Sequence, residues 1–378
     1  MRRPRHVNGR PALSGPGGFA RYHHEVTARL VERDGATVVA PPARGAGPFA
    51  RLVGARWWEQ RSLVAATADG VLLSTANNGP IRHPCHAVIV HDLLPYTPPH
   101  TVSPTYARFQ RAYLPRLCRS AAAVITVSDH VAGELVASFD LDPGTITVAP
   151  PGVGAPFRPD PNVDAVASRR TARARFGIGD HQVLVTALVS SIPRKRSAEV
   201  LHVLRTVAAS RPEVAVVVAG HDGPRRVFGR HAVRPVAPDV PDLGPIADDA
   251  LHELLVAADV FVALPEAEGF GLPQVEALVC GAAVVGAPVP SLTEWAMRPA
   301  GAGGVATATA VQLVADGDGA VAAAGYAVSA CFGSIQRTSL TPWSELPVAG
   351  SITKLAKPTR SFPPFAIRGA RQVEHPEP

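Results

Sequence analysis

The chain has 378 residues, of which 46% are hydrophobic and 18% charged, enough for about two domains with buried cores. No apolar run reaches the roughly 18 to 20 residues that span a bilayer, and the first residues lack the apolar segment of a signal peptide, so we expect a cytoplasmic protein. The net charge of +6 comes mostly from dispersed arginines, which argues against nucleic acid and favours a phosphorylated small molecule or an anionic membrane surface.

Apolar runs bounded by turn residues alternate with helical patterns along the first half of the chain. Buried strands are predicted at residues 70–74, 86–92 and 122–128, and a helix is predicted over 106–120. Residues 3–13 offer only a weak first strand. This alternation is typical of a parallel α/β architecture.

The same alternation returns in the second half. Strands are predicted at 181–190, 213–220, 259–264 and 282–287, and helices at 197–210 and 248–258. Prolines and glycines at 148–164 suit a linker, so we predict one Rossmann-like domain over 1–155 and another over 156–296. Since parallel sheets bind ligands at the carboxyl ends of their strands, functional residues are sought in the loops that follow strands.

The composition changes after residue 296 to an Ala/Gly/Thr-rich stretch and then a Pro/Arg-rich end. Such a composition seldom buries a core, and we predict a poorly ordered tail over 297–378. One hypothesis is a change of reading frame in a GC-rich gene. The chain contains abundant arginine, alanine and proline but only the lysines Lys195, Lys354 and Lys357, which fits this hypothesis.

A glycine-rich stretch with two glutamates, PEAEGFGLPQVEALVCG at 265–281, follows a predicted strand. Pro273 and Gly281 punctuate the two ends of a short helix, so Glu268 lies in the loop before this helix and Glu276 lies on it. Both carboxylates can accept hydrogen bonds from sugar hydroxyls. The alternative is a tight glycine turn with two solvated glutamates.

The backbone of the same loop is suited to an anion. Amides of Gly269, Phe270 and Gly271 would stand at the N-terminus of the predicted helix, where the helix dipole favours phosphate. Arg194 and Lys195 occupy a second loop between a strand and a helix, where they can neutralise a diphosphate. The alternative for the two cations is a solvated basic turn.

Three residues of the first half are further candidates. Gly17 and Gly18 would let the backbone approach a phosphate closely, since a side chain there would collide with it. His91 ends a predicted strand, and its alternative interpretation is a structural histidine. Asp92 is expected to cap the following turn.

These stretches, in this order along the chain, resemble glycosyltransferase family 4, the retaining enzymes of the GT-B fold. Glu268 and Glu276, eight positions apart around GFGLP, resemble the E-x7-E signature of that family. The resemblance covers roughly residues 7–296 and includes the segments 15–26, 91–109, 124–135, 146–159 and 190–201. It implies an α/β protein with two Rossmann-like domains that face each other across a cleft.

The resemblance also implies an activity. The expected enzyme is a hexosyltransferase that moves a hexose from a nucleotide sugar to a glycan or lipid-linked acceptor. The best match for the donor is GDP-mannose, and the hexose would then be mannose. No metal is expected, because the Asp-x-Asp signature of other sugar transferases is expected to be absent from the two domains. The basic surface is compatible with peripheral contact with an anionic membrane.

By the same resemblance, Arg194 and Lys195 bind the donor's diphosphate and Glu276 the ribose. Glu268 and His91 contact the transferred sugar. The backbone makes the remaining donor contacts, at Gly17, Gly18, Phe270 and Gly271.

Two other classes of function are weighed against an active transferase. A catalytically impaired nucleotide-sugar-binding protein would follow if the atypical tail left the two domains poorly coupled. A nicotinamide-dependent oxidoreductase is disfavoured, because no G-x-G-x-x-G follows a first strand with an acid about 20 residues on.

Overall fold

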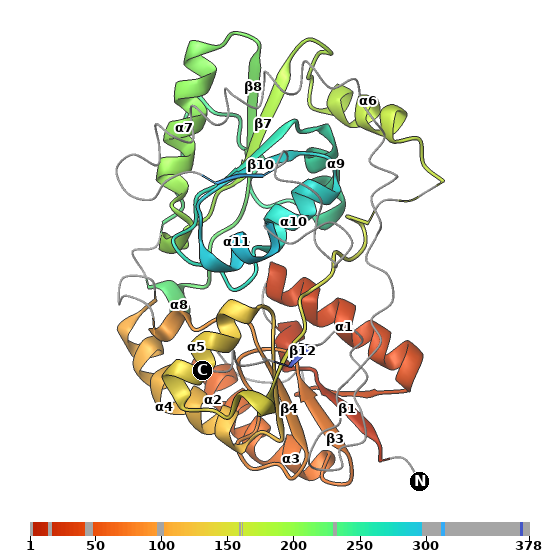
Figure 1. Cartoon of the computed structure of the whole chain (residues 1–378), viewed down its shortest axis with the longest axis vertical. Coiled ribbons are helices and arrows are strands. Elements are labelled where there is room, and N and C mark those ends of the chain that lie inside the picture. Colours follow the sequence, from red (N-terminus) through yellow and green to blue (C-terminus); the bar gives the residue numbers. More distant parts are fainter. Residues whose placement is uncertain are drawn as a thin grey trace, which may run out of the picture. The chain divides into compact units, whose positions relative to one another are not determined.

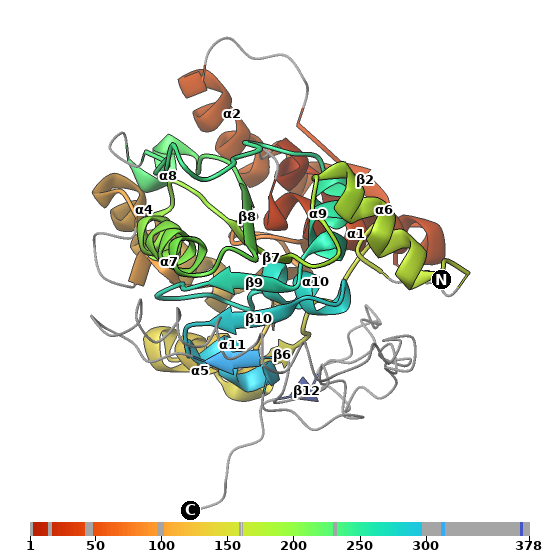
Figure 2. The same cartoon turned by 90° about the horizontal axis from the view of Figure 1, so that it is seen from above.

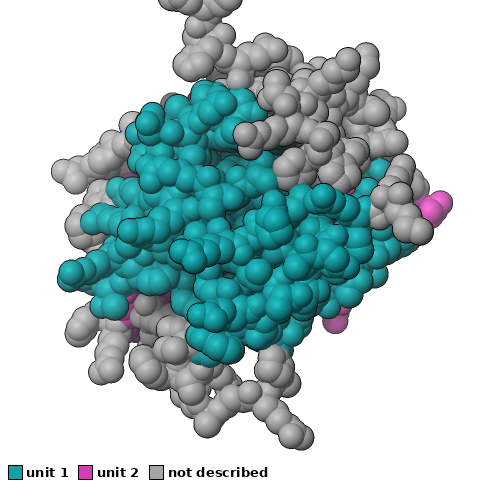
Figure 3. All heavy atoms as spheres, turned by 90° about the horizontal axis from the view of Figure 1, so that it is seen from below, with its two compact units in different colours: residues 1–97, 104–152, 351–378 teal, residues 98–103, 153–350 magenta. Residues whose placement is uncertain are grey.

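A computed structural model describes residues 3–13, 17–41, 48–96, 102–158, 160, 162–229, 233–296, 311–313 and 371–372. The chain divides into two compact units (Figures 1 and 3). The described residues of unit 1 fall within 1–97, 104–152 and 351–378, and those of unit 2 within 98–103 and 153–350. Each unit is built on one sheet of mainly parallel strands flanked by helices, which confirms the predicted α/β class.

Unit 1 contains a seven-stranded sheet in the order β12-β6-β5-β4-β3-β1-β2. Its strands are β1 (Arg5–Asn8), β2 (Thr37–Val39), β3 (Val71–Ser74), β4 (His86–Val90), β5 (Ala123–Thr126), β6 (Ile146–Val148) and β12 (Arg371–Gln372). All neighbours are parallel except β12, which runs antiparallel to β6. The weak first strand of the sequence is therefore a short strand inside the sheet, between β2 and β3.

Helices cover both faces of this sheet (Figure 1). They are α1 (Gly18–Asp34), α2 (Pro48–Gln60), α3 (Ser62–Ala66), α4 (Pro104–Ser120) and α5 (Asp129–Phe139). Leu30 of α1 packs with Val7, Leu73 and Ile89 of the strands in one core cluster. All five residues of β4 are buried, as expected for a parallel strand covered on both sides.

Helix α4 contains a proline at position 115. Because proline has no backbone N–H, the carbonyl of Arg111, one turn earlier, loses its helical partner. The hydroxyl of Tyr96 donates a hydrogen bond of 3.3 Å to this carbonyl. A side chain thus satisfies the group that the proline leaves unpaired.

Unit 2 contains a five-stranded parallel sheet in the order β11-β10-β9-β7-β8. Its strands are β7 (Val183–Leu188), β8 (Val214–Ala219), β9 (Val260–Ala263), β10 (Ala283–Gly286) and β11 (Val311–Leu313). Its helices are α6 (Ala165–Arg175), α7 (Ser197–Ser210), α8 (Arg225–Phe228), α9 (Asp248–Ala257), α10 (Leu272–Val279) and α11 (Pro290–Ala296). Leu184 faces the core under α9 and α10, while its neighbour Val185 faces the core under α7, on the other side of the sheet (Figures 1 and 2).

The strand order of each unit reverses at one point. In unit 2 the chain passes from β7 through α7 to β8 on one side, and then crosses to β9 on the other side of β7. The carboxyl ends of β7 and β9 therefore flank the place where open parallel sheets bind ligands. In unit 1 the corresponding point lies between β1 and β3.

Every strand predicted from the sequence contains an observed strand, and the helix predicted over 197–210 is α7 with the same bounds. The predicted helix over 106–120 begins two residues earlier, at Pro104. The predicted tail over 297–378 lies outside the described residues, except for β11 and β12.

Candidate functional site

Two loops meet at the reversal point of unit 2. The loop after β7 carries Arg194 and Lys195 in a short 3-10 turn, and the loop after β9 carries Glu268. The backbone N–H of Glu266 donates to the carbonyl of Arg194 at 2.8 Å, and Nη1 of Arg194 donates to the carbonyl of Ala267 at 2.5 Å. The two loops are thus joined through both the backbone and the side chain of Arg194.

Glu268 forms ion pairs with both cations of the first loop. Its Oε2 lies 2.8 Å from Nη1 of Arg194, and its Oε1 lies 3.4 Å from Nζ of Lys195. Burial alone would raise the pKa of Glu268, but Arg194 and Lys195 outweigh it and hold this pKa below its usual range. The carboxylate is ionised, and two cations against one anion leave the cluster with a net positive charge.

Two side chains of helix α11 donate hydrogen bonds to the glycine-rich loop. The hydroxyl of Ser291 donates to the carbonyl of Glu268 at 2.5 Å, and Nε1 of Trp295 donates to the carbonyl of Phe270 at 2.8 Å. Both side chains are buried. Two carbonyls of the loop are therefore held by side chains of α11.

The end of this loop starts helix α10. Gly271 is the N-cap residue and has a φ of 86°, a left-handed conformation that glycine adopts without strain. Among the residues that the structure describes, no acceptor bonds the backbone N–H of Phe270 or Gly271. Unpaired amides at a helix N-terminus are the elements of an anion site.

Glu276 lies on α10, just over one turn after Gly271, and is 2% exposed. Burial, together with the nearby Glu276, raises the pKa of the Cys280 thiol to about 12. The alternative of two solvated glutamates is wrong, because the Glu268 side chain is also only 11% exposed. Both acids of the motif are enclosed by the protein.

The candidate residues of unit 1 follow its strands β1 and β4. Gly17 is the N-cap of α1 with a φ of 145°, and Gly18 is the first residue of that helix. Residues 14–16, which precede them in the glycine-rich segment, lie outside the described part of the chain. The two glycines thus open a helix at the carboxyl end of β1.

His91 is held in one orientation after β4. Its backbone N–H donates to Oδ1 of Asn77 at 2.8 Å, and its Nε2 lies 2.9 Å from the carbonyl of Thr75. The ring also contacts Phe19 and Tyr22 of α1, with ring centroids 4.5 and 4.6 Å away. Since a carbonyl only accepts, Nε2 carries the proton, and Nδ1 is the acceptor of the neutral ring.

The electrostatics of His91 favour this neutral form. Burial lowers the pKa of His91 to about 4, although its hydrogen bond to Thr75 acts in the opposite direction. The next residue, Asp92, accepts a hydrogen bond from the N–H of Leu94 at 3.4 Å, as expected for a turn cap. At neutral pH, His91 is an uncharged side chain with one lone pair to offer.

The sequence did not single out four residues that position the candidates. Thr75 and Asn77 orient His91, and Ser291 and Trp295 hold the glycine-rich loop. Polar residues directly after a predicted strand are a signal that could have identified the first pair. The second pair lies beyond the next strand, and no local pattern links it to the loop.

The expectation that the two domains lack an Asp-x-Asp stretch is wrong. Asp140 and Asp142 form an Asp-x-Asp stretch within the first predicted domain. Their roles are local, because Asp140 ends α5 and Oδ1 of Asp142 accepts a hydrogen bond from the N–H of Gly144 at 2.9 Å. Within the described ranges, no three His, Cys, Asp or Glu side chains gather as metal ligands.

A search of the helices in the described ranges finds none with both the length and the apolar character of a membrane span.

Two family models match the chain in succession. The model described as Glycosyltransferase Family 4 matches residues 16–155, and the model described as Glycosyl transferases group 1 matches residues 168–312. Together they cover the loops of both units. The chain belongs to glycosyltransferase family 4.

Curated relatives of this family member include two D-inositol 3-phosphate glycosyltransferases. That of Stackebrandtia nassauensis is 35% identical over 184 residues, covering 45% of this chain and 40% of the relative. That of Mycolicibacterium gilvum is 35% identical over 176 residues, covering 45% of this chain and 37% of the relative. The chain thus spans less than half the length of the curated relatives it matches.

Solved structures agree on the fold. WaaG, a glycosyltransferase involved in lipopolysaccharide biosynthesis, matches with a TM-score of 0.64 at 17% identity, covering 90% of this chain and 93% of WaaG. Sucrose-phosphate synthase from Thermosynechococcus elongatus matches with a TM-score of 0.63 at 16% identity, covering 88% of this chain and 90% of that one. The family 4 chain has the GT-B fold.

Proposed function

We propose that the protein is a retaining hexosyltransferase that uses a nucleoside-diphosphate sugar as donor. The observation that carries this proposal is the cluster of Arg194, Lys195 and Glu268 at the reversal point of unit 2, beside the unpaired amides of Phe270 and Gly271. A positively charged cluster next to free N–H groups suits a diphosphate. A buried carboxylate within the same cluster suits a ligand that also carries hydroxyls.

Each candidate residue of unit 2 has a role in this proposal. Arg194 and Lys195 bind the diphosphate and stabilise the charge that builds up on the nucleoside diphosphate as it leaves. Glu268 accepts hydrogen bonds from the transferred sugar, and Glu276 accepts them from the ribose. The amides of Phe270 and Gly271 complete the contacts to the sugar and the diphosphate.

The residues of unit 1 act on the same donor in this proposal. Gly17 and Gly18 admit the diphosphate close to the backbone at the start of α1. His91 contacts the transferred hexose, and its Nδ1 accepts a hydrogen bond from a sugar hydroxyl. A neutral imidazole suits this role, since a protonated ring would have no lone pair to offer.

The reaction exchanges one bond for another at the anomeric carbon. The bond from this carbon to the donor's phosphate oxygen breaks as the bond to the acceptor oxygen forms on the same face of the sugar. The acceptor's proton passes to the departing phosphate, so no carboxylate nucleophile is required. Arg194 and Lys195 assist because they take up the charge of the leaving group.

The proposed donor sugar is mannose, carried by GDP, and the proposed acceptor is a glycan or a lipid-linked molecule. The curated relatives are named for a different acceptor, inositol 3-phosphate. An Anabaena HepE structure contains UDP-glucose, and at 18% identity its likeness concerns the fold alone. The choice between these donors is therefore left to experiment.

The second candidate is a nucleotide-sugar-binding protein without turnover. It is favoured by the atypical composition of residues 297–378, most of which lie beyond the family-model match that ends at residue 312. Loss of domain closure would reduce turnover before it reduced donor binding. Binding and transfer must therefore be measured separately.

The test is a calorimetric titration of GDP, UDP and ADP into the whole chain and into Glu276→Ala, followed by a transfer assay with the matching sugar donors. We expect one nucleotide to bind tightly and to bind about tenfold or more weakly to the variant, because a hydrogen bond to a charged group is lost. Binding without transfer would favour the second candidate. A folded chain that binds none of the three nucleotides would contradict both.

A further inference from the structure

A buried glutamine lies at the start of helix α10, next to the glycine-rich loop of unit 2. Gln274 is the third residue of this helix and is 2% exposed. Within the described ranges, its amide oxygen Oε1 is buried without a hydrogen-bond partner. A buried carbonyl oxygen that accepts no hydrogen bond costs free energy, so the fold alone gives no reason for a glutamine at this position.

The amide group of Gln274 folds back over the N-cap residue of the helix. Its Oε1 lies 3.3 Å from the point where a Cβ on Gly271 would stand, and Cδ1 of Leu292 lies 3.0 Å from the same point. A glutamine at this helix position often accepts a hydrogen bond from the N–H of the N-cap residue. Among the described residues, however, no acceptor bonds the N–H of Gly271. The described start of α10 therefore presents an unpaired acceptor beside an unpaired donor.

The two groups require different atoms of a ligand. The N–H of Gly271 donates, and it suits a phosphate oxygen at the positive end of the helix dipole. Oε1 of Gln274 only accepts, whereas an ionised diphosphate has only acceptor oxygens. The partner of Oε1 is therefore a hydroxyl or an N–H group close to the phosphate. In a nucleoside-diphosphate sugar, the hydroxyls on either side of the diphosphate belong to the ribose and to the transferred hexose.

The geometry of the helix favours the hexose over the ribose. Glu276, the proposed ribose ligand, lies two positions after Gln274 on α10. Residues two positions apart on an α-helix point to different sides of it, since each residue turns the chain by about 100°. Glu268, the proposed hexose ligand, lies in the loop that leads into α10, and the Gln274 amide folds back over the last residue of this loop, Gly271.

We infer that Gln274 determines the specificity of the donor site for the transferred hexose, because its Oε1 accepts a hydrogen bond from one of the hexose hydroxyls. The inference rests on the proposed function, since the hexose arrives as part of the donor. The N–H of Gly271 takes a phosphate oxygen of the same donor. On binding, Gln274 gains the partner that it lacks in the fold, so it contributes to affinity for the sugar and not to stability.

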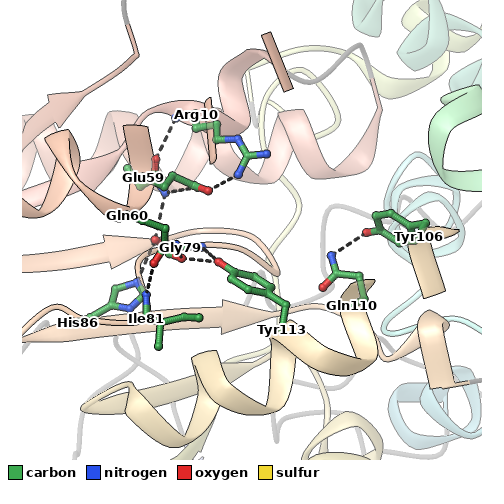
Figure 4. Close-up of polar contacts among 11 residues, drawn as sticks. Arg10, Glu59, Gln60, Gly79, Ile81, His86, Tyr106, Gln110 and Tyr113 are labelled. Carbon is green, nitrogen blue, oxygen red and sulfur yellow. Dashed lines mark hydrogen bonds and ion pairs between the residues drawn. The ribbon is translucent and has the colours of Figure 1, made fainter. Parts of the chain in front are cut away.

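The test replaces Gln274 by leucine, an apolar side chain of comparable size. Since no hydrogen bond of Oε1 is lost, thermal unfolding should show an unchanged or higher Tm for Gln274→Leu. Gln110→Leu is the control. Gln110 of α4 is 3% exposed, and its Nε2 donates to the hydroxyl of Tyr106 at 3.1 Å (Figure 4), while its Oε1 is buried without a partner in the described part of unit 1. Should Gln274→Leu fail to fold, Gln274→Met keeps the length of the side chain and takes its place.

The probes are GDP, UDP and ADP, each compared by calorimetry with a sugar form, namely GDP-mannose, UDP-glucose or ADP-glucose. For the base that binds, the quantity of interest is the Kd of the sugar form divided by the Kd of the diphosphate. We expect Gln274→Leu to raise this ratio about threefold to tenfold, the range for one lost neutral hydrogen bond, and to leave the Kd of the diphosphate unchanged. Gln110→Leu should leave the ratio unchanged.

An unchanged ratio in a folded Gln274→Leu chain, or the same increase in Gln110→Leu, would overturn the inference and leave the proposed function standing. Equal weakening of both ligands together with a lower Tm would assign Gln274 to capping of the helix and would also overturn it. Loss of folding in both Gln274 variants would show that the fold needs the amide, with the same consequence. If the unaltered chain bound none of the probes, the proposed function would fail, and the inference would fail with it.

Discussion

The two units share one architecture, but the surroundings of Glu268 in unit 2 and of His91 in unit 1 differ in charge. Around its candidate site, unit 2 gathers charged groups, with Glu268 paired to Arg194 and Lys195. His91 of unit 1 contacts the uncharged groups of Phe19, Tyr22, Thr75 and Asn77, and burial lowers its pKa to about 4. Burial also lowers the pKa of His86, at the start of β4, to about 3. The loop ends of the two sheets therefore carry an ionised cluster in unit 2 and a neutral, hydrogen-bonded histidine in unit 1.

The conditions under which these buried groups destabilise the fold differ between the two units. A charge pair that is buried at the end of a sheet loses solvation, and it is stable only while both partners are present. A neutral imidazole avoids this cost at neutral pH but becomes unfavourable when acid protonates it. The predictions below separate the units by removing a charge partner in one and by adding protons to the other.

The largest effect is expected from Arg194→Ala. The change leaves the buried Glu268 with its weaker ion pair to Lys195, at 3.4 Å, and removes the side-chain bond to the Ala267 carbonyl. We expect the free energy of unfolding to fall by about 3 to 5 kcal/mol, as for other broken buried pairs. Urea denaturation measures this loss.

Arg205→Ala is the matched control in the same unit, because the Arg205 pair with Asp239 is more than half exposed. Exposed pairs contribute little to stability, so no measurable change is expected. Equal losses in Arg194→Ala and Arg205→Ala would mean that burial does not distinguish the two pairs, and the buried pair of unit 2 would carry no special cost.

Acid is expected to destabilise unit 1 through its histidines. His86 takes a proton near pH 6.5 when unfolded, but burial lowers its pKa to about 3 in the folded chain. Between these values the unfolded chain binds more protons, so this contribution to stability is complete above about pH 6.5 and is lost as the pH falls toward 3. Stability curves measured from pH 7 to pH 4 should show this slope.

The slope should decrease in His86→Gln, which removes one titrating group from unit 1. His202→Gln is the control, since His202 lies on an exposed position of α7 in unit 2. An unchanged slope in His86→Gln, measured on a folded protein, would mean that carboxylates elsewhere govern the acid response.

A smaller effect is expected from Trp295→Phe. The change keeps the aromatic ring in the core but removes the hydrogen bond of 2.8 Å to the Phe270 carbonyl. A loss of about 1 kcal/mol in the free energy of unfolding is expected for one hydrogen bond. Since the bond holds the glycine-rich loop, nucleotide affinity measured by calorimetry should also decrease. Lost stability with unchanged affinity would separate the loop from the donor site.

The elements of the sheets could be predicted because parallel strands are short apolar runs between turn residues. The segments 181–190 and 259–264 needed only this local signal, and β7 and β9 lie within them. The candidate residues after these strands could be placed for the same reason.

The contacts between those residues could not be predicted from local patterns. The ion pair of Arg194 with Glu268 exists because β7 lies beside β9, although β8 lies between them in the sequence. Strand order is a property of the whole sheet. Trp295 likewise bonds the loop from α11, although α10 and β10 lie between them in the sequence.

Two buried polar residues of unit 1 could not be recognised from the sequence, because both lie on helices. Gln110 lies on the buried side of α4, where a polar residue looks like an ordinary exception to the helical pattern. Only the structure shows that its amide oxygen lacks a partner. The fully buried Glu59 on α2 is a similar case, since charged residues are rarely buried unless paired.

The most direct test of the central claim concerns Lys195, the more exposed of the two cations paired with Glu268. For whichever nucleoside diphosphate binds most tightly, its affinity and that of its parent nucleoside are measured by calorimetry on the whole chain and on Lys195→Ala. We predict that the variant binds the diphosphate about tenfold or more weakly, because it loses a charged hydrogen bond, and binds the nucleoside unchanged. Equal weakening of both ligands, or of neither, would contradict a diphosphate site at this cluster.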